Sequence, residues 1–270
     1  MYRHRLNNRF TLLLGVFGMA FAALLLCGSA GTVHAATAFV QIATTTTSGG
    51  VSTRVATFPS NVTNGDVIVF GVVTGVSVTN VTASCVTGNL TIVASSTNGS
   101  NSGYWGYGIT NATGACSVTV NTGGNTSLNI TASEISGVST ASPLDVATST
   151  NDSFATNHTS GNVTTTAAGD YIYGLEINPA GNGATYTAGS GYTTRGYVNS
   201  AFFVEDEVQA AAGSIAATST SSGGSTDIVV IMAMKPPASP GGITNKVRLS
   251  AINGGKIRIS GINGGKVRIR

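Results

Sequence analysis

The chain has 270 residues, of which 41% are hydrophobic and only 9% are charged. Typical soluble domains contain about 25% charged residues, so Ser, Thr, Asn and Gly must supply most of the polar surface. This composition excludes a coiled coil or a charged helical bundle, and the apolar fraction argues against a chain kept disordered by high net charge.

The N-terminus has the pattern of a secretory signal peptide. Three arginines lie in the first nine residues, and an uncharged apolar run follows at 12–26. That run is too short to favour a stable membrane span, and residues 33–35 give the small-x-small pattern of a cleavage site. We predict a signal peptide at 1–35 and a secreted, extracellular or cell-surface protein without a stable transmembrane span. Cleavage after Ala30 and an uncleaved anchor are the alternatives.

Removal of the signal leaves two cysteines, Cys85 and Cys116, in a compartment that permits oxidation. We predict that they form one disulfide. Closing a loop of about 30 residues would stabilise the fold by about 3–4 kcal/mol on the chain-entropy model. Two buried thiols are the alternative.

Residues 36–236 contain many short β-branched runs separated by Gly, Asn and Ser. Turn residues recur about every 8–12 positions, which is typical of an all-β sandwich or barrel. Two runs, 67–70 and 228–231, are apolar at every position and predict central strands covered on both faces. We predict an antiparallel two-sheet, jelly-roll-like β-sandwich. Its clearest strands are expected at 39–43, 52–58, 66–73, 90–94, 104–109, 116–120, 128–135, 171–177, 201–208, 214–218 and 228–234.

A family resemblance rests on six segments, which occur in this order: ATFPSNVTNGDVIVFGV, EISGVSTASPLDV, VTTTAAGDYIYG, AGSGYTTR, VEDEVQAAAGSIAAT and IVVIMAMKP. Together they resemble a widespread secreted bacterial β-sandwich module of jelly-roll type, over nearly all of residues 36–236. The resemblance implies a fold and an extracellular setting. The family has no agreed activity, so the resemblance supplies no catalytic residues, and the cysteine pair is not part of its pattern.

The C-terminal part begins with a Pro/Gly-rich linker at 237–242, PASPGG. Residues 243–270 then repeat with a period of ten, as KVRLSAINGG, KIRISGINGG and KVRIR. The alternation of basic and apolar residues and the Asn-Gly-Gly turns predict a small basic β-meander. One face is expected to carry Val247, Leu249, Ile257, Ile259, Val267 and Ile269. The other is expected to bind anions through Lys246, Arg248, Lys256, Arg258, Lys266, Arg268 and Arg270.

Charge is strongly segregated along the chain. The tail at 243–270 has seven basic residues and no acid, a formal charge of +7, whereas residues 36–236 have three basic residues and all ten acids, a formal charge of −7. Like charges on neighbouring strands repel, so the tail should gain stability from an anion. An anionic envelope polymer or lipid, a surface glycan, a partner protein and the acidic body are the candidates. Nucleic acid is disfavoured because the tail has no aromatic residue to stack on bases.

Residues that could carry chemistry are few. Tyr104, Trp105 and Tyr107 form the densest aromatic cluster and could bind carbohydrate, with core packing as the alternative. On a strand, Trp105 and Tyr107 share one face and Tyr104 lies on the other. His158 is the only histidine after residue 35 and lies in a polar stretch, so we interpret it as a loop residue. We therefore expect neither a Ser–His–Asp constellation nor a zinc site.

Paired carboxylates are the remaining route to catalysis. Glu205 and Glu207 should share a strand face with Asp206 opposite, which could serve a glycoside-active enzyme, although a solvated strand face is the simpler interpretation. The sequence predicts no catalytic residue, cofactor or metal ion. Our leading hypothesis is a secreted, non-enzymatic cell-surface or matrix protein that its cationic tail tethers to an anionic polymer or partner. A carbohydrate-binding module and a glycoside-active enzyme are the alternatives.

Overall fold

The structure is a computed structural model. It describes residues 36–46, 49–181, 183–198 and 201–238, together with the pairs 248–249 and 259–260. These residues form strands and turns and no helix, so none of them belongs to a helix able to cross a membrane. The predicted signal peptide and most of the tail lie outside the described residues. One compact unit comprises His34–Ala238, and we call it the sandwich.

The first half of the sandwich forms two antiparallel sheets. A five-stranded sheet has the order β1-β8-β3-β6-β5, and a three-stranded sheet has the order β2-β7-β4. The strands are β1 (Ala38–Thr45), β2 (Val51–Thr57), β3 (Val67–Thr74), β4 (Val78–Ala83), β5 (Thr91–Asn98), β6 (Asn101–Ile109), β7 (Ser117–Thr126) and β8 (Leu128–Ser136).

The second half is built in the same way. Its five-stranded sheet has the order β9-β18-β12-β15-β14, its three-stranded sheet has the order β10-β17-β13, and β11 pairs with β16. The strands are β9 (Leu144–Asn151), β10 (Ala155–Thr159), β11 (Val163–Thr164), β12 (Asp170–Ile177), β13 (Tyr186–Ala188), β14 (Thr193–Val198), β15 (Phe202–Gln209), β16 (Ser214–Ile215), β17 (Thr218–Ser225) and β18 (Ile228–Met234).

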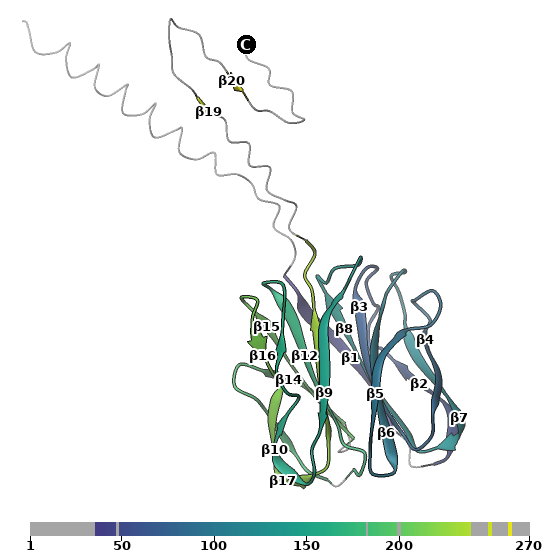
Figure 1. The fold of residues 1–270 in the computed structure, drawn as a ribbon. Helices are drawn as coiled ribbons and strands as arrows, with labels where there is room; N and C mark the ends of the chain where they lie inside the picture. The colour runs from purple at the N-terminus through teal and green to yellow at the C-terminus, as the bar shows by residue number, and fades with distance from the viewer. Residues whose placement is uncertain are drawn as a thin grey trace, which may run out of the picture. The chain divides into compact units, whose positions relative to one another are not determined.

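The two halves are an internal structural repeat. The five-stranded sheets have equivalent strand orders, β1-β8-β3-β6-β5 in the first half and β9-β18-β12-β15-β14 in the second. The three-stranded sheets are equivalent in the same way, with the orders β2-β7-β4 and β10-β17-β13. Even the short β11–β16 pair has a counterpart, the bridge between Val62 and Gly114. We call strands β1–β8 the first repeat and strands β9–β18 the second repeat; they lie side by side in Figure 1.

The same turn opens the central strand of each repeat. Gly65 precedes Asp66 and β3, and Gly169 precedes Asp170 and β12. Both glycines have positive φ angles, 91° and 84°, which a residue without a Cβ adopts at little cost. This Gly-Asp pair is the clearest sequence trace of the repeat.

The two five-stranded sheets pack face to face and enclose the main core. That core takes alternate residues from the central strands, such as Val67 and Val69 of β3 and Val230 and Met232 of β18. Each five-stranded sheet also buries its other face under the three-stranded sheet of its own repeat. The order of layers is therefore three-stranded, five-stranded, five-stranded, three-stranded.

Two sequence predictions about the fold are confirmed. The antiparallel all-β sandwich is present, although it has more layers than the predicted pair of sheets because the fold is repeated. The apolar runs lie in β3 and β18, and every residue of both strands is buried, because each strand has a core on both faces.

The predicted disulfide joins Cys85 to Cys116. Cys85 follows β4 and Cys116 precedes β7, so the bridge links neighbouring strands of the first repeat's three-stranded sheet. Both cysteines are buried in the core beneath that sheet. The second repeat contains no cysteine.

One strand pair is described in the tail. β19 (Arg248–Leu249) pairs antiparallel with β20 (Ile259–Ser260), and Leu249 lies opposite Ile259. The register agrees with the first hairpin of the expected meander, whose remaining residues lie outside the described part.

Candidate functional site

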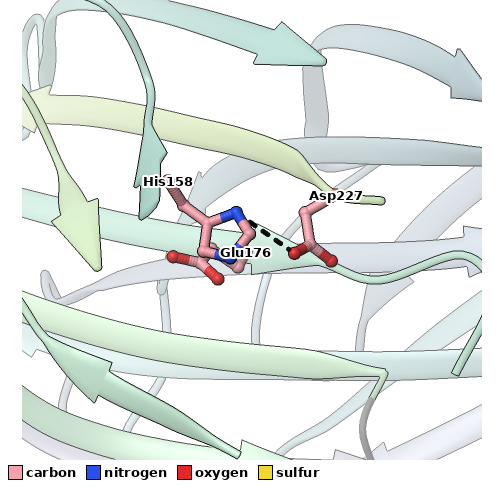
Figure 2. A group of neighbouring side chains, drawn as sticks. All are labelled: His158, Glu176 and Asp227. Atoms are coloured by element: carbon pink, nitrogen blue, oxygen red, sulfur yellow. Dashed lines mark ion pairs between the residues drawn. The ribbon is translucent and has the colours of Figure 1, made fainter. Parts of the chain in front are cut away.

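A buried polar cluster lies in the second repeat, between the three-stranded sheet and the central strands. It consists of His158 on β10, Glu176 on β12 and Asp227, which immediately precedes β18. Their exposed fractions are 2%, 3% and 0%. One potential ligand atom from each lies within 4.8 Å of the others, and Figure 2 shows the His158 ring with the carboxyl groups of Glu176 and Asp227 beside it.

His158 is held by hydrogen bonds at both ring nitrogens. Nδ1 lies 2.9 Å from Asp152 Oδ2 and 3.4 Å from Asp227 Oδ2, and Nε2 lies 2.8 Å from Ser221 Oγ. The Ser221 hydroxyl donates to the Gly223 carbonyl at 2.7 Å, so its single hydrogen is already used. Both carboxylates therefore face Nδ1, and Ser221 faces Nε2.

This environment corrects the interpretation of His158 as a loop residue. His158 lies on a strand and is buried. The sequence of β10, ATNHT, has no apolar residue beyond its first alanine, so nothing in its pattern indicates burial. Asp152 is six residues away, but Ser221 is 63 residues away, so the tertiary structure completes the network.

The cluster has the connectivity of a Ser–His–Asp constellation but not its proton arrangement. In such a site the serine hydroxyl donates to the histidine, which then removes its proton. Here the Ser221 hydroxyl donates to Gly223 instead, and the His158 side chain has no exposed surface. The enclosed ring and the Ser221–Gly223 hydrogen bond distinguish this cluster from such a site.

Glu176 has one satisfied and one unsatisfied carboxyl oxygen. Oε1 accepts a hydrogen bond from the Ser219 hydroxyl, whereas Oε2 has no partner among the described residues. Burial raises the pKa of Glu176 to about 9, against the opposing effect of the Ser219 hydrogen bond. A buried oxygen without a partner is costly, so Oε2 marks a position where a ligand would be stabilised.

Asp227 is supported by hydroxyl donors. Tyr186 donates to its carboxylate at 3.0 Å and Ser225 donates to Oδ2 at 2.5 Å. Burial raises the pKa of Asp227, while these hydrogen bonds and His158 lower it. The side chain is thus fixed with its carboxylate directed at the ring of His158.

The cluster has more carboxyl groups than cations. Asp152, Glu176 and Asp227 surround one histidine. The three Lys and Arg residues of the described sandwich have partners elsewhere. Arg195 pairs with Asp206 at 2.7 Å, Lys235 pairs with Asp145 at 3.5 Å, and Arg54 donates to Thr45 at 2.8 Å. Negative charge in the cluster must be removed by protonation or balanced by a cation.

The first repeat shows that the fold does not require polar residues here. Val118 of β7 lies between Ala56 and Ala83, and all three belong to an apolar core. The corresponding residue of β17, Ser219, lies between His158 and Ala188. Six residues after Asp66 is the buried Val72; six after Asp170 is Glu176. His158, Ser219 and Glu176 therefore occupy positions that Ala56, Val118 and Val72 fill by packing alone.

The structure revises the aromatic cluster. Trp105 is 2% exposed and lies in the main core, so its ring offers no open face to a sugar, contrary to the carbohydrate hypothesis. Tyr107 packs partly buried against the same core, and Tyr104 packs against the core on the other side of the sheet. The predicted division of faces is correct, but the faces are packed.

The predicted carboxylate pair is divided between environments. Glu205 is buried and accepts a hydrogen bond from the Gly189 amide at 3.0 Å, while Glu207 is half-buried. Asp206 lies on the opposite face, paired with Arg195. Of the predicted anion-binding residues, only Arg248 lies in a described segment, and the others lie outside it.

Each repeat also contains a buried pair of acids near its Gly-Asp turn. Burial raises the pKa of Asp66 to about 7, helped by neighbouring Glu134, and burial with neighbouring Asp145 raises that of Asp170 to about 7. The partner acids are held alike: the Thr63 amide donates to Glu134 at 2.8 Å, and the Thr166 amide donates to Asp145 at 2.5 Å.

Comparisons with known proteins add no identification. No family model matches the chain, and no curated protein or solved structure matches it. The antiparallel β-sandwich and the buried cluster are therefore interpreted from their own chemistry.

Proposed function

We propose that the chain is an exported, non-enzymatic β-sandwich protein of the cell surface or matrix, held on an anionic surface polysaccharide by the cations of its C-terminal repeat. The signal-like N-terminus and the resemblance to a secreted bacterial jelly-roll-type module support the setting. The repeat at 243–270 supplies the cations.

The distribution of acids in the sandwich is the observation that carries the proposal. Each of its ten acidic side chains is buried or half-buried, and none is exposed. The formal charge of −7 is therefore internal, and raised pKa values reduce it further at neutral pH. The sandwich surface consequently offers the tail little negative charge, which disfavours the body as the tail's anionic partner.

A repeating cation array suits a ligand whose charge also repeats. Basic residues recur at every second position within each tail unit and again ten residues later. Residues two apart on a strand are about 6.6 Å apart and point to the same side. A polysaccharide with regularly spaced carboxylates or sulfates also repeats its charge along the chain, so its anions can pair with successive cations of the tail.

Retention on immobilised dextran sulfate, with neutral dextran as the matched matrix, tests the proposal. The chain should bind dextran sulfate at about 0.05 M NaCl and be released towards about 1 M, because the Debye length falls to about 3 Å. Replacing the seven tail cations with glutamine should abolish retention. Arg54→Gln, which removes a cation of the sandwich, should leave it intact.

Two results would contradict the tether. Retention of the glutamine variant at wild-type strength would place binding in the sandwich. Equal, salt-independent retention on neutral dextran would instead support the carbohydrate-binding alternative. Folding of each variant is checked independently by its urea unfolding midpoint.

A further inference from the structure

We infer that His158, Glu176 and Asp227 form a binding site for one zinc ion in the interior of the second repeat. The three residues provide one imidazole nitrogen and two carboxylate oxygens. Zinc is bound by imidazole nitrogen and by carboxylate oxygen, and the nitrogen makes the set less suited to calcium or magnesium, which prefer oxygen.

The unsatisfied oxygen of Glu176 is the independent evidence for a ligand. Oε2 is buried and has no partner among the described residues. The Glu176 carboxyl group lies beside the His158 ring in Figure 2. An ion bonded at about 2.1 Å holds its ligand atoms about 3–4 Å apart. The present upper separation of 4.8 Å requires only small side-chain movements.

The surrounding residues support the ligands in the manner expected of a metal site. Ligating histidines usually donate their second ring nitrogen to a carboxylate, and ligating carboxylates are themselves hydrogen-bonded. Asp152 lies 2.9 Å from His158 Nδ1 and can accept its proton when Nε2 binds the ion. Binding requires Nε2 to give up its contact with Ser221, and Asp227 Oδ2, which lies 3.4 Å from Nδ1, to turn towards the ion. Tyr186 and Ser225 fix Asp227.

Charge balance and the internal repeat lead to the same conclusion. A divalent cation would balance the excess of carboxylates in the cluster. The described part of the cluster contains no Lys or Arg that could balance them. The corresponding position in the first repeat is closed by Ala56, Val72 and Val118. His158, Glu176 and Ser219 are therefore additions to a fold that packs without polar residues at these three positions.

Zinc binding by the purified, EDTA-stripped full chain tests the site. The chain is dialysed against ZnCl2, and its zinc content is measured by elemental analysis. The wild type should bind one zinc ion per chain more than a double variant with Glu176→Gln and His158→Asn. A hundredfold excess over Kd should raise Tm by about 5–10 °C, and EDTA should reverse the shift. CaCl2 should leave Tm unchanged.

Variants distinguish a metal site from a structural network. Glu176→Gln alone is nearly isosteric and should weaken zinc binding at least tenfold, whereas Asp170→Asn, which alters a buried acid on the same strand, should leave it unchanged. Cobalt substitution should give visible absorption that the double variant lacks. The inference is wrong if zinc stoichiometry is equal in wild type and double variant, or if Tm responds to calcium and not to zinc.

Discussion

The two repeats have the same strand order and different interiors beneath their three-stranded sheets. In the first repeat that space is apolar and the sheet is cross-linked by Cys85–Cys116. In the second it contains His158, Glu176 and Asp227, and there is no disulfide. One architecture thus tolerates either a sealed hydrophobic layer or a polar cluster. The difference places the inferred zinc site in the second repeat.

The largest expected effect comes from placing the second repeat's acid in the first. Val72→Glu puts a carboxyl where Val118 and Ala56 offer no hydrogen bond, so the free energy of unfolding should fall by more than about 4 kcal/mol. Urea unfolding followed by intrinsic fluorescence measures the loss, and soluble yield reports it if the variant does not fold.

The matched control is the reverse exchange. Glu176→Val combined with Ser219→Ala removes both partners of one hydrogen bond, so stability should change by no more than about 1 kcal/mol. A loss as large as that of Val72→Glu would mean that the polar cluster is needed for folding. The proposed distinction between the repeats would then fail.

Loss of the disulfide should have the next largest effect. The cysteines are 31 residues apart, and loop closure predicts a loss of about 3–4 kcal/mol for the Cys85→Ala, Cys116→Ala double variant. Hydrogen exchange should accelerate in β4 and β7 more than in β13 and β17, because the bridge lies in the first repeat only. Equal acceleration in both repeats would contradict this assignment.

A smaller effect concerns the acid pairs that the repeats share. Asp66 and Asp170 have folded pKa values of about 7, above the ordinary value of 3.8, so the native state retains protons that the unfolded chain releases. The free energy of unfolding should therefore fall as pH rises from about 4 to about 7, by at most about 1.4 kcal/mol per pH unit for each group.

Asparagine at either position mimics the protonated acid. Asp66→Asn and Asp170→Asn should each flatten this pH dependence and raise stability at pH 8 by roughly 1–3 kcal/mol. Urea midpoints measured across the range test both variants. A variant whose curve runs parallel to the wild-type curve would show that its acid is ionised in the native state.

The signals that predicted the central strands are local. The uninterrupted apolar runs of β3 and β18 require cover on both faces, and both strands are buried. Strands such as β9 (LDVATSTN) and β10 were missed because Ser, Thr and Asn dominate them. These strands are held in their sheets by pairing with β18 and β17. Glu176, an acid inside the apolar strand DYIYGLEI, was the available sign of a buried site.

The sequence by itself determined the all-β class, the pairing of the two cysteines and the segregation of basic residues into the tail, because β-branched patterning, cysteine number and charge are local properties. The tertiary structure alone decided the repeat, the burial of Trp105 and the meeting of His158, Glu176 and Asp227. These depend on which strands become neighbours. Such pairing joins residues that are far apart along the chain and is only weakly encoded by any one segment.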